Sequence, residues 1–357
     1  MSDPSPLPPP TARPRSERRS VWIGLVGVLL AGAAYTAVWF TAAAQLRDAA
    51  LAWIEARRAE GYGITFGRFD IEGFPFLLRA IVTDPAVKAP PGRGAWEWRG
   101  PTARVEARPW SLASATAHLP GRHWLSLGEQ QTYVAEAAEF DLRVEKAGAA
   151  AATALLHVES LSLASGDGAP LIEIAGADGA ARSLETPNPD HRTPTLEMKL
   201  LAENVSLRGT PDLPLGQSVG QVGLEAALLG RIPPASSSAE AFALWRDDGG
   251  TVEVRRLNLD YGPLSLQADG TAALDAGLQP IVAFTARLQG FFETVDALRA
   301  RGVIRDGDAV TAKIVLGALA GKGAGESKAT LSAPVTIQGR MLFVGPVALF
   351  HLPEIRW

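Results

Sequence analysis

The chain has 357 residues, of which 47% are hydrophobic and 20% are charged. Its 34 Lys and Arg residues are dispersed among 38 Asp and Glu residues, which gives a formal net charge of -4. A chain of this length can bury a large core, and the charge pattern offers no basic stripe on which nucleic acid could dock. The lack of cysteine excludes disulfides, thiolate metal sites and thiol nucleophiles.

The first predicted element is a transmembrane helix over residues 21–40. This segment carries no charged residue, and at about 1.5 Å per residue it spans a hydrocarbon core of about 30 Å. Trp22 and Trp39 lie near its two ends, where indole side chains favour the membrane interface. Residues 1–20 are rich in Pro, Ser and Arg, so we expect a flexible basic tail there.

The arginines predict the orientation of this helix. Four of them precede it, at positions 13, 15, 18 and 19, and basic residues favour the cytoplasmic side. Three others follow it, at positions 47, 57 and 58, so the bias is incomplete. We expect a single-pass protein of the inner (cytoplasmic) membrane, with its N-terminus in the cytoplasm and its main domain in the periplasm.

A cleaved secretory signal is the alternative to an anchor, because residues 42–44 are three alanines, as a cleavage site requires. The apolar stretch is longer than the usual signal core of about 7–15 residues, which favours an uncleaved anchor. Residues 41–60 continue with strong helix formers up to Gly61, which predicts a juxtamembrane helix.

Residues 61–357 are predicted to form a β-rich domain, because the apolar period changes there from helical to two. The clearest hairpin joins residues 252–259 to residues 264–274 across a Tyr261-Gly262-Pro263 turn. The alternation slips by one residue at Arg255-Arg256, which indicates a β-bulge. Similar alternation recurs around positions 140–144, 161–163, 196–200 and 222–228.

Two helices are predicted within this β-rich domain. One covers Ser236 to Asp248, where serines can cap the first turn and two glycines follow. The other covers Phe291 to Arg301 and stops at Gly302. The expected fold is mainly β: an extended antiparallel sheet with a few short helices, which could curl around an apolar groove.

A search for chemistry finds no catalytic, cofactor-binding or metal-binding constellation in the sequence, so we do not expect an enzyme. His118 and His123 have the spacing of half a zinc finger, but the cysteines of the other half are absent. Ser218 stands in a Gly-x-Ser-x-Gly sequence, but the residues after it have a strand period where a nucleophile elbow needs a helix. Residues 305–308 and 317–323 are expected to be turns rather than a calcium loop or a phosphate loop.

Several short motifs together resemble a known family. They are Gly73-Phe74-Pro75-Phe76-Leu77-Leu78-Arg79, Leu244-Trp245-Arg246, Gly249-Gly250-Thr251, Gly262-Pro263-Leu264, Gly270-Thr271, Gly345-Pro346-Val347-Ala348-Leu349 and Leu352-Pro353. With the N-terminal anchor, they resemble the membrane-anchored bacterial family called domain of unknown function 2125. This resemblance supplies no catalytic residues. Taken from the residues alone, Gly73 to Phe76 is expected to be a tight turn with its two aromatics packed beneath it.

The second half is also loosely similar to the C-terminal ends of AsmA-like proteins. That similarity implies an inner-membrane-anchored envelope protein whose sheet curls into an apolar groove and which takes part in phospholipid movement and outer-membrane upkeep. The alternation of the sequence leads in the same direction. A long sheet with one apolar face needs that face to be covered by a second sheet, by helices or by lipid.

We therefore expect an envelope protein that binds or moves lipid acyl chains. Candidate groove residues are Leu257, Leu259, Leu264 and Leu266, although core packing is the commoner fate of such leucines. The alternative is a structural or assembly factor that binds another envelope protein. The expected partners are thus the membrane, phospholipid or a second envelope protein.

Overall fold

The computed structural model describes most of the chain. The described residues are 15–90, 95–128, 131–148, 151–184, 189–209, 213–235, 237–320, 330–355 and 357. Within them lie four helices: α1 (Arg15–Ala59), α2 (Ser238–Asp247), α3 (Phe291–Ala300) and α4 (Asp306–Leu319).

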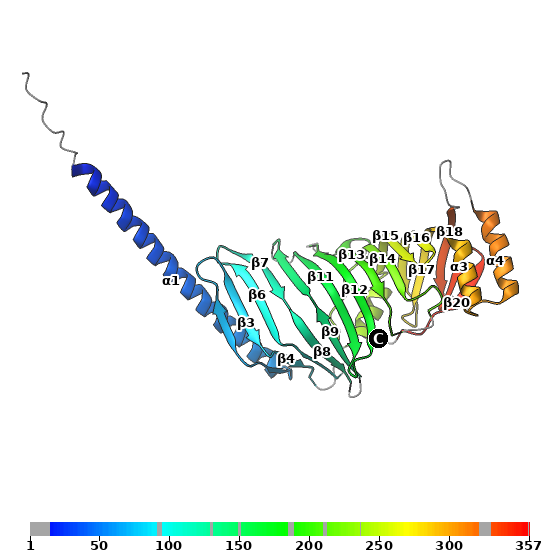
Figure 1. Ribbon diagram of the computed structural model, residues 1–357, viewed down its shortest axis with the longest axis horizontal. Helices are drawn as coiled ribbons and strands as arrows, with labels where there is room; N and C mark the ends of the chain where they lie inside the picture. The colour runs from blue at the N-terminus through cyan, green and yellow to red at the C-terminus, as the bar shows by residue number, and fades with distance from the viewer. Residues whose placement is uncertain are drawn as a thin grey trace, which may run out of the picture.

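Twenty strands in the same described ranges form one antiparallel sheet that does not close into a barrel (Figure 1). They are β1 (Gly63–Thr65), β2 (Phe69–Glu72), β3 (Leu78–Thr83), β4 (Ala86–Lys88), β5 (Trp96–Arg99), β6 (Thr102–Arg108), β7 (Ser111–His118), β8 (Gly121–Leu127), β9 (Gln131–Ala137), β10 (Glu139–Lys146), β11 (Ala152–Ser165), β12 (Pro170–Ser183), β13 (Pro194–Ser206), β14 (Ser218–Leu229), β15 (Thr251–Tyr261), β16 (Leu264–Leu274), β17 (Pro280–Gln289), β18 (Thr330–Gln338), β19 (Met341–Val344) and β20 (Val347–His351). The prediction of a mainly β fold built on one extended antiparallel sheet is confirmed.

The helix α1 joins the predicted span and the predicted juxtamembrane helix into one element of 45 residues. It is long and apolar enough to cross a membrane. Its first residues, from Arg15 onward, lie within the segment expected to be a tail, and residues 1–14 lie outside the described residues. Figure 1 shows its N-terminal half extending away from the sheet, while its C-terminal half runs beside the first strands.

The strands follow a simple up-and-down order once short strands are joined in pairs. β1 with β2, β3 with β4, β5 with β6, β7 with β8, and β9 with β10 each form one long strand that is interrupted near its middle. Each long strand then pairs with the next one along the chain, from β1–β2 through to β20. The alternating pattern and the frequent turn residues of the sequence therefore produce a meander.

The interruptions of neighbouring strands lie opposite one another. Asp84 N–H donates to the Pro101 carbonyl at 2.9 Å, and Gly100 N–H donates to the Pro85 carbonyl at 3.0 Å. In later strands, two residues with left-handed backbone conformation mark the same level of the sheet: Ser160 (φ 50°) and Asn204 (φ 51°). Irregularities of this kind bend a strand and increase its twist, so their alignment favours a sheet that is bent along one line.

The predicted hairpin and its bulge are confirmed. β15 and β16 pair from Val252 to Tyr261 across the Gly262-Pro263 turn, and the register shifts between Val254 and Leu257. Arg255 and Arg256 stand there opposite the single residue Asp269, at the point where the sequence alternation slips.

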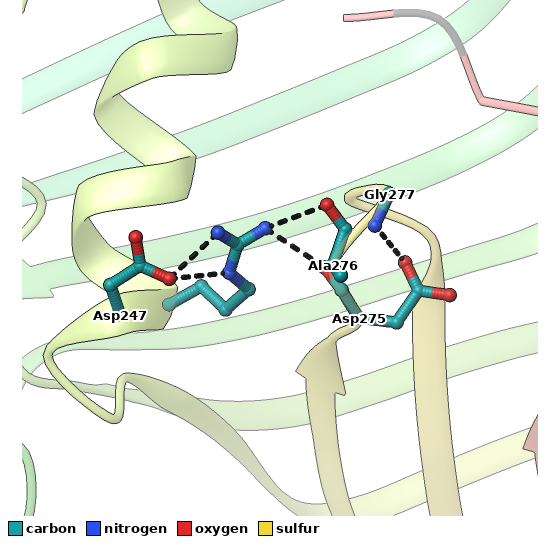
Figure 2. Close-up of polar contacts among 5 residues, drawn as sticks. Asp247, Asp275, Ala276 and Gly277 are labelled. Carbon is teal, nitrogen blue, oxygen red and sulfur yellow. Dashed lines mark hydrogen bonds and ion pairs between the residues drawn. The ribbon is translucent and has the colours of Figure 1, made fainter.

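Helix α2 connects β14 to β15 and is tied to the turn between β16 and β17. The Arg246 guanidinium donates to the Asp275 carbonyl at 3.0 Å and to the Ala276 carbonyl at 3.1 Å, while it also pairs with Asp247 (Figure 2). α2 begins after a Ser237 cap and ends one residue before Asp248, close to the predicted bounds; Ser236 lies outside the described residues.

Helices α3 and α4 form a pair at the other end of the sheet from α1 (Figure 1). α3 was predicted within one residue. The turn predicted at residues 305–308 is wrong, because Asp306 starts α4. The turn predicted from Gly317 is also wrong where it can be seen, since Gly317 lies inside α4; residues 321–323 lie outside the described residues. Lys313 Nζ joins the two helices by an ion pair to Asp296 at 2.6 Å.

Candidate functional site

One face of the sheet is apolar from end to end. Residues directly opposite each other in adjacent strands lie on the same face, so the register identifies a row that crosses thirteen strands. The row consists of Ile71, Ala80, Val105, Ala117, Leu142, Leu156, Gly179, Leu200, Leu224, Leu257, Ala268, Ala286 and Ala333. We call the face that carries this row the apolar face.

The adjacent row has the opposite character and lies on the other face. It consists of Asp70, Ile81, Arg104, His118, Asp141, His157, Asp178, Leu201, Gly223, Asn258, Gln267, Arg287 and Ser332. We call this second face the polar face. Because the side-chain period of a strand is two, this sharp contrast shows that the register is strongly specified.

Helices cover the two ends of the apolar face. At the first end, Trp39 and Ala43 of α1 pack on Leu78, and Ile71 joins this cluster. At the other end, a core of Leu288, Leu331 and neighbours packs under Phe291 of α3 and Leu316 of α4. Covered ends of this kind have the ordinary packing of a protein interior.

Between the covered ends, several side chains of the apolar face are open to solvent. Val105 is 41% exposed, Val144 is 36% exposed and Leu200 is 42% exposed. At about 25 cal/mol per Å² of apolar surface, covering one such side chain is worth roughly 1–2 kcal/mol. From β6 to β14 the open part crosses six interstrand steps of about 4.8 Å, or roughly 29 Å. An exposed strip of this length is typical of a binding surface.

The four predicted groove leucines lie on this apolar face but toward its covered end. Leu257 pairs with Ala268, and Leu259 pairs with Leu266. Leu257, Leu264 and Leu266 pack against the core under α3 and α4. The four leucines therefore lie on the apolar face, whereas its open stretch lies several strands earlier in the chain.

The polar face carries a ladder of alternating histidines and aspartates. His118 Nδ1 lies 2.6 Å from Asp141 Oδ1, and His157 Nδ1 lies 2.7 Å from Asp178 Oδ1. The hydrogen bond to Asp178 raises the pKa of His157 above its ordinary value, since the imidazolium is the form that the carboxylate stabilises. These residues line a shallow hollow of about 800 Å³ on this face.

Within the described ranges, one group of three side chains has the spacing of metal ligands. It consists of Glu139, His157 and Glu159, whose ligand atoms lie within 4.8 Å of one another. All three are exposed, and Glu139 and Glu159 stand directly opposite each other on β10 and β11. Exposed acidic groups of this kind are common without an ion, so this arrangement does not identify a metal site.

The motifs considered for catalysis lie apart from one another. Ser218 is the first residue of β14, and a strand, not a helix, follows it. His123 stacks on Trp98 with ring centroids 5.7 Å apart and lies in β8. Ser218 therefore does not lie at the strand-to-helix turn that a nucleophile elbow requires.

The predicted interface tryptophans of α1 differ in their surroundings. Trp22 is exposed, whereas Trp39 is buried. Trp39 Nε1 donates to the Leu77 carbonyl at 3.1 Å. Trp39 therefore joins α1 to the sheet at the point where the apolar segment ends.

The turn predicted at Gly73 is confirmed, but the burial of its aromatics is wrong. Leu77 N–H donates to the Gly73 carbonyl at 2.9 Å, and Gly73 has φ 104°. Phe74 is 47% exposed and Phe76 is 69% exposed. The sequence pattern could not reveal this, because it does not show that the turn lies beside α1 at the rim of the sheet.

Comparisons with known proteins give one match, to a family model. No curated protein and no solved structure matches the chain. A family model matches residues 39–353, a range that starts at Trp39, where α1 meets the sheet, and ends just after β20. The chain therefore belongs to the family described as an uncharacterized protein conserved in bacteria (DUF2125).

Proposed function

We propose that this protein is a membrane-anchored envelope protein that holds the acyl chains of phospholipid on the apolar face of its sheet. The observation that supports this proposal is the apolar face, which is covered by helices at both ends and exposed at Val105, Val144 and Leu200 between them. Lipid tails match this strip, since they are flexible, wholly apolar and need no hydrogen bonds. In this proposal the protein binds lipid without altering it chemically.

The proposal places α1 across the inner membrane as a single-pass anchor. The uncharged residues 21–40 cross the bilayer, and the arginines before them stay in the cytoplasm. The sheet then lies in the periplasm, and its first strands are held next to the bilayer by α1.

A second candidate function is the binding of another envelope protein. Val310 and Ile314 lie one helical turn apart on α4 and are both exposed. Such a pair suits an apolar partner helix or strand. In this case the domain would act as an assembly factor held near the membrane.

The test uses a photoreactive amino acid incorporated at position 200 of the full-length protein in living bacterial cells. Position 155 is the matched control, because Leu155 is 38% exposed, much like Leu200, but lies on the polar face. We expect phospholipid adducts at position 200 and none at position 155. Protein adducts without lipid at position 200 would instead support the second candidate.

A pair of charged substitutions gives an independent test. In Leu200→Glu, a carboxylate would lie under the lipid tail, and an unpaired buried charge costs several kcal/mol. We expect about a tenfold or greater loss of lipid co-purified with the protein, because each 1.4 kcal/mol is a factor of ten. Leu155→Glu should retain its lipid, since that carboxylate would face solvent beside Arg143.

A further inference from the structure

Exposed apolar side chains gather at the rim of the sheet where α1 leaves it. Phe74 and Phe76 lie in the turn between β2 and β3, and Trp110 and Leu112, 61% and 63% exposed, lie at the turn between β6 and β7. The two turns are neighbours, because β3 pairs with β6 and β6 pairs with β7. We call these four residues the anchor edge.

Direct contacts join the anchor edge to α1. The Phe74 ring stacks with Phe40, with centroids 5.8 Å apart, and meets Trp39 edge-on at 5.5 Å. The Tyr35 hydroxyl donates a hydrogen bond to the Pro75 carbonyl. The turn is thus fixed to α1 at the end of the predicted transmembrane segment, whose last residue is Phe40.

In the C-terminal part of α1, charged residues begin only beyond this level. After Phe40 the first is Arg47, about 10 Å further along the helix axis at 1.5 Å per residue. Arg47 lies over the Phe69 ring, 5.8 Å from its centroid, and so faces the sheet. An apolar rim at the level of Phe40 and a charged helix surface below it match the depth profile of a membrane interface.

Single exposed apolar residues are common on protein surfaces, but a cluster of large ones at adjacent turns marks an interaction site. Three of the four residues are aromatic, and aromatic side chains favour the headgroup region of a bilayer. The apolar face reaches this rim, because Leu78, next to the turn, shares a row with Ala107, Ala115 and the exposed Val144.

We propose that the anchor edge inserts into the outer surface of the bilayer that α1 crosses and seats the rim of the apolar face on it. This inference rests on the proposed function, and it names the source of the bound lipid as that same bilayer. Phe74, Phe76 and Trp110 lie among the headgroups, and lipid tails pass from the bilayer onto the sheet along the row that contains Val144.

The test uses the absence of cysteine from the chain. Single cysteines are placed at Phe76, Trp110, Trp22 and Leu127 in the full-length protein and carry an environment-sensitive dye. Each protein is reconstituted into phosphatidylethanolamine–phosphatidylglycerol vesicles that contain nitroxide-labelled lipid. Leu127→Cys is the control, because Leu127 is exposed, apolar and located at the opposite rim of the sheet, at the end of β8.

We expect the nitroxide lipid to quench the dye at positions 22, 76 and 110 and to leave position 127 fluorescent. Quenching at position 22 with none at 76 and 110 would overturn the anchor-edge proposal while leaving the anchor in place. A lack of quenching at position 22 would overturn the anchor itself. Equal quenching at 76 and 127 would also overturn the proposal, because the sheet would then lie flat on the membrane.

Discussion

At the scale of single residues, the polar face is organised by polar side-chain pairs across neighbouring strands. His157 and Asp178 are the clearest pair, since they lie directly opposite each other and share a hydrogen bond of 2.7 Å. Glu159, 3.5 Å from His157 Nε2, adds to the negative surroundings of the ring. Cross-strand pairs of this type contribute to strand register as well as to stability.

The first residue-scale prediction concerns the protonation of His157. Asp178→Asn removes the hydrogen-bonded carboxylate, so the pKa of His157 should fall toward its ordinary value. NMR titration of the imidazole measures this change. Glu173→Gln is the control, because Glu173 lies on the same strand but pairs with Arg208; an equal fall in that variant would contradict the assignment.

The sign of the matching pH dependence follows from the raised pKa of His157 in the folded protein. The stabilising contact is complete at pH values below the ordinary histidine pKa, and it is lost as the pH rises through the raised pKa. The pH dependence of unfolding should therefore flatten in Asp178→Asn over that range.

At the scale of elements, the connection between β17 and α3 depends on one glycine. Gly290 has φ 69°, and a Cβ atom there would lie 1.8 Å from the Pro263 carbonyl oxygen. Gly302 has a similar φ of 71°, but no atom lies within 4 Å of its Cβ position. The two glycines thus separate backbone strain from steric contact.

We predict that Gly290→Ala lowers the melting temperature much more than Gly302→Ala does. The left-handed conformation alone costs a non-glycine residue roughly 1–2 kcal/mol, and Gly290→Ala must also displace the backbone at Pro263. Thermal unfolding followed by circular dichroism in detergent provides the comparison. Equal losses of melting temperature in the two variants would show that Gly290 does not lie against Pro263 in the β15–β16 turn.

Local sequence patterns predicted most elements but not α4. The strands around Leu142, Leu200 and Leu266 alternate cleanly, because each contributes to one apolar face and one polar face. α4 begins with Asp306-Gly307-Asp308, which favours a turn by composition. The helix forms because tertiary contacts stabilise it, including the buried Ala309 and the ion pair between Lys313 and Asp296; such contacts override local propensity.

The candidate site was likewise predictable where it depends on local sequence pattern, and not where it depends on contacts between distant segments. The apolar face could be predicted from alternation, and Leu257 and Leu266 do lie on it. Which part of that face remains open depends on where α1 and α4 pack, and those contacts join segments far apart in the sequence. For this reason neither the exposure of Leu200 nor that of Phe76 could be predicted.

At the scale of the whole molecule, the proposal requires the sheet and the N-terminal tail to lie on opposite sides of a membrane. The cysteine-free chain permits a direct test with Ser5→Cys and Ser332→Cys, the latter on the exposed polar face of β18. We predict that a membrane-impermeant maleimide labels Ser332→Cys in intact cells and labels Ser5→Cys only after permeabilisation. The reverse pattern would place the sheet in the cytoplasm and contradict the envelope function.

The up-and-down order of the strands also bears on how the protein is made. Every long strand pairs with its neighbours in the chain, so contacts are short in sequence and folding does not wait for remote segments. During synthesis the N-terminal part emerges first. The C-terminal half of α1 can therefore pack against β1 and β2 before the later strands have been made. Each newly delivered strand then meets a partner that is already in place, so the sheet can grow at a single advancing edge.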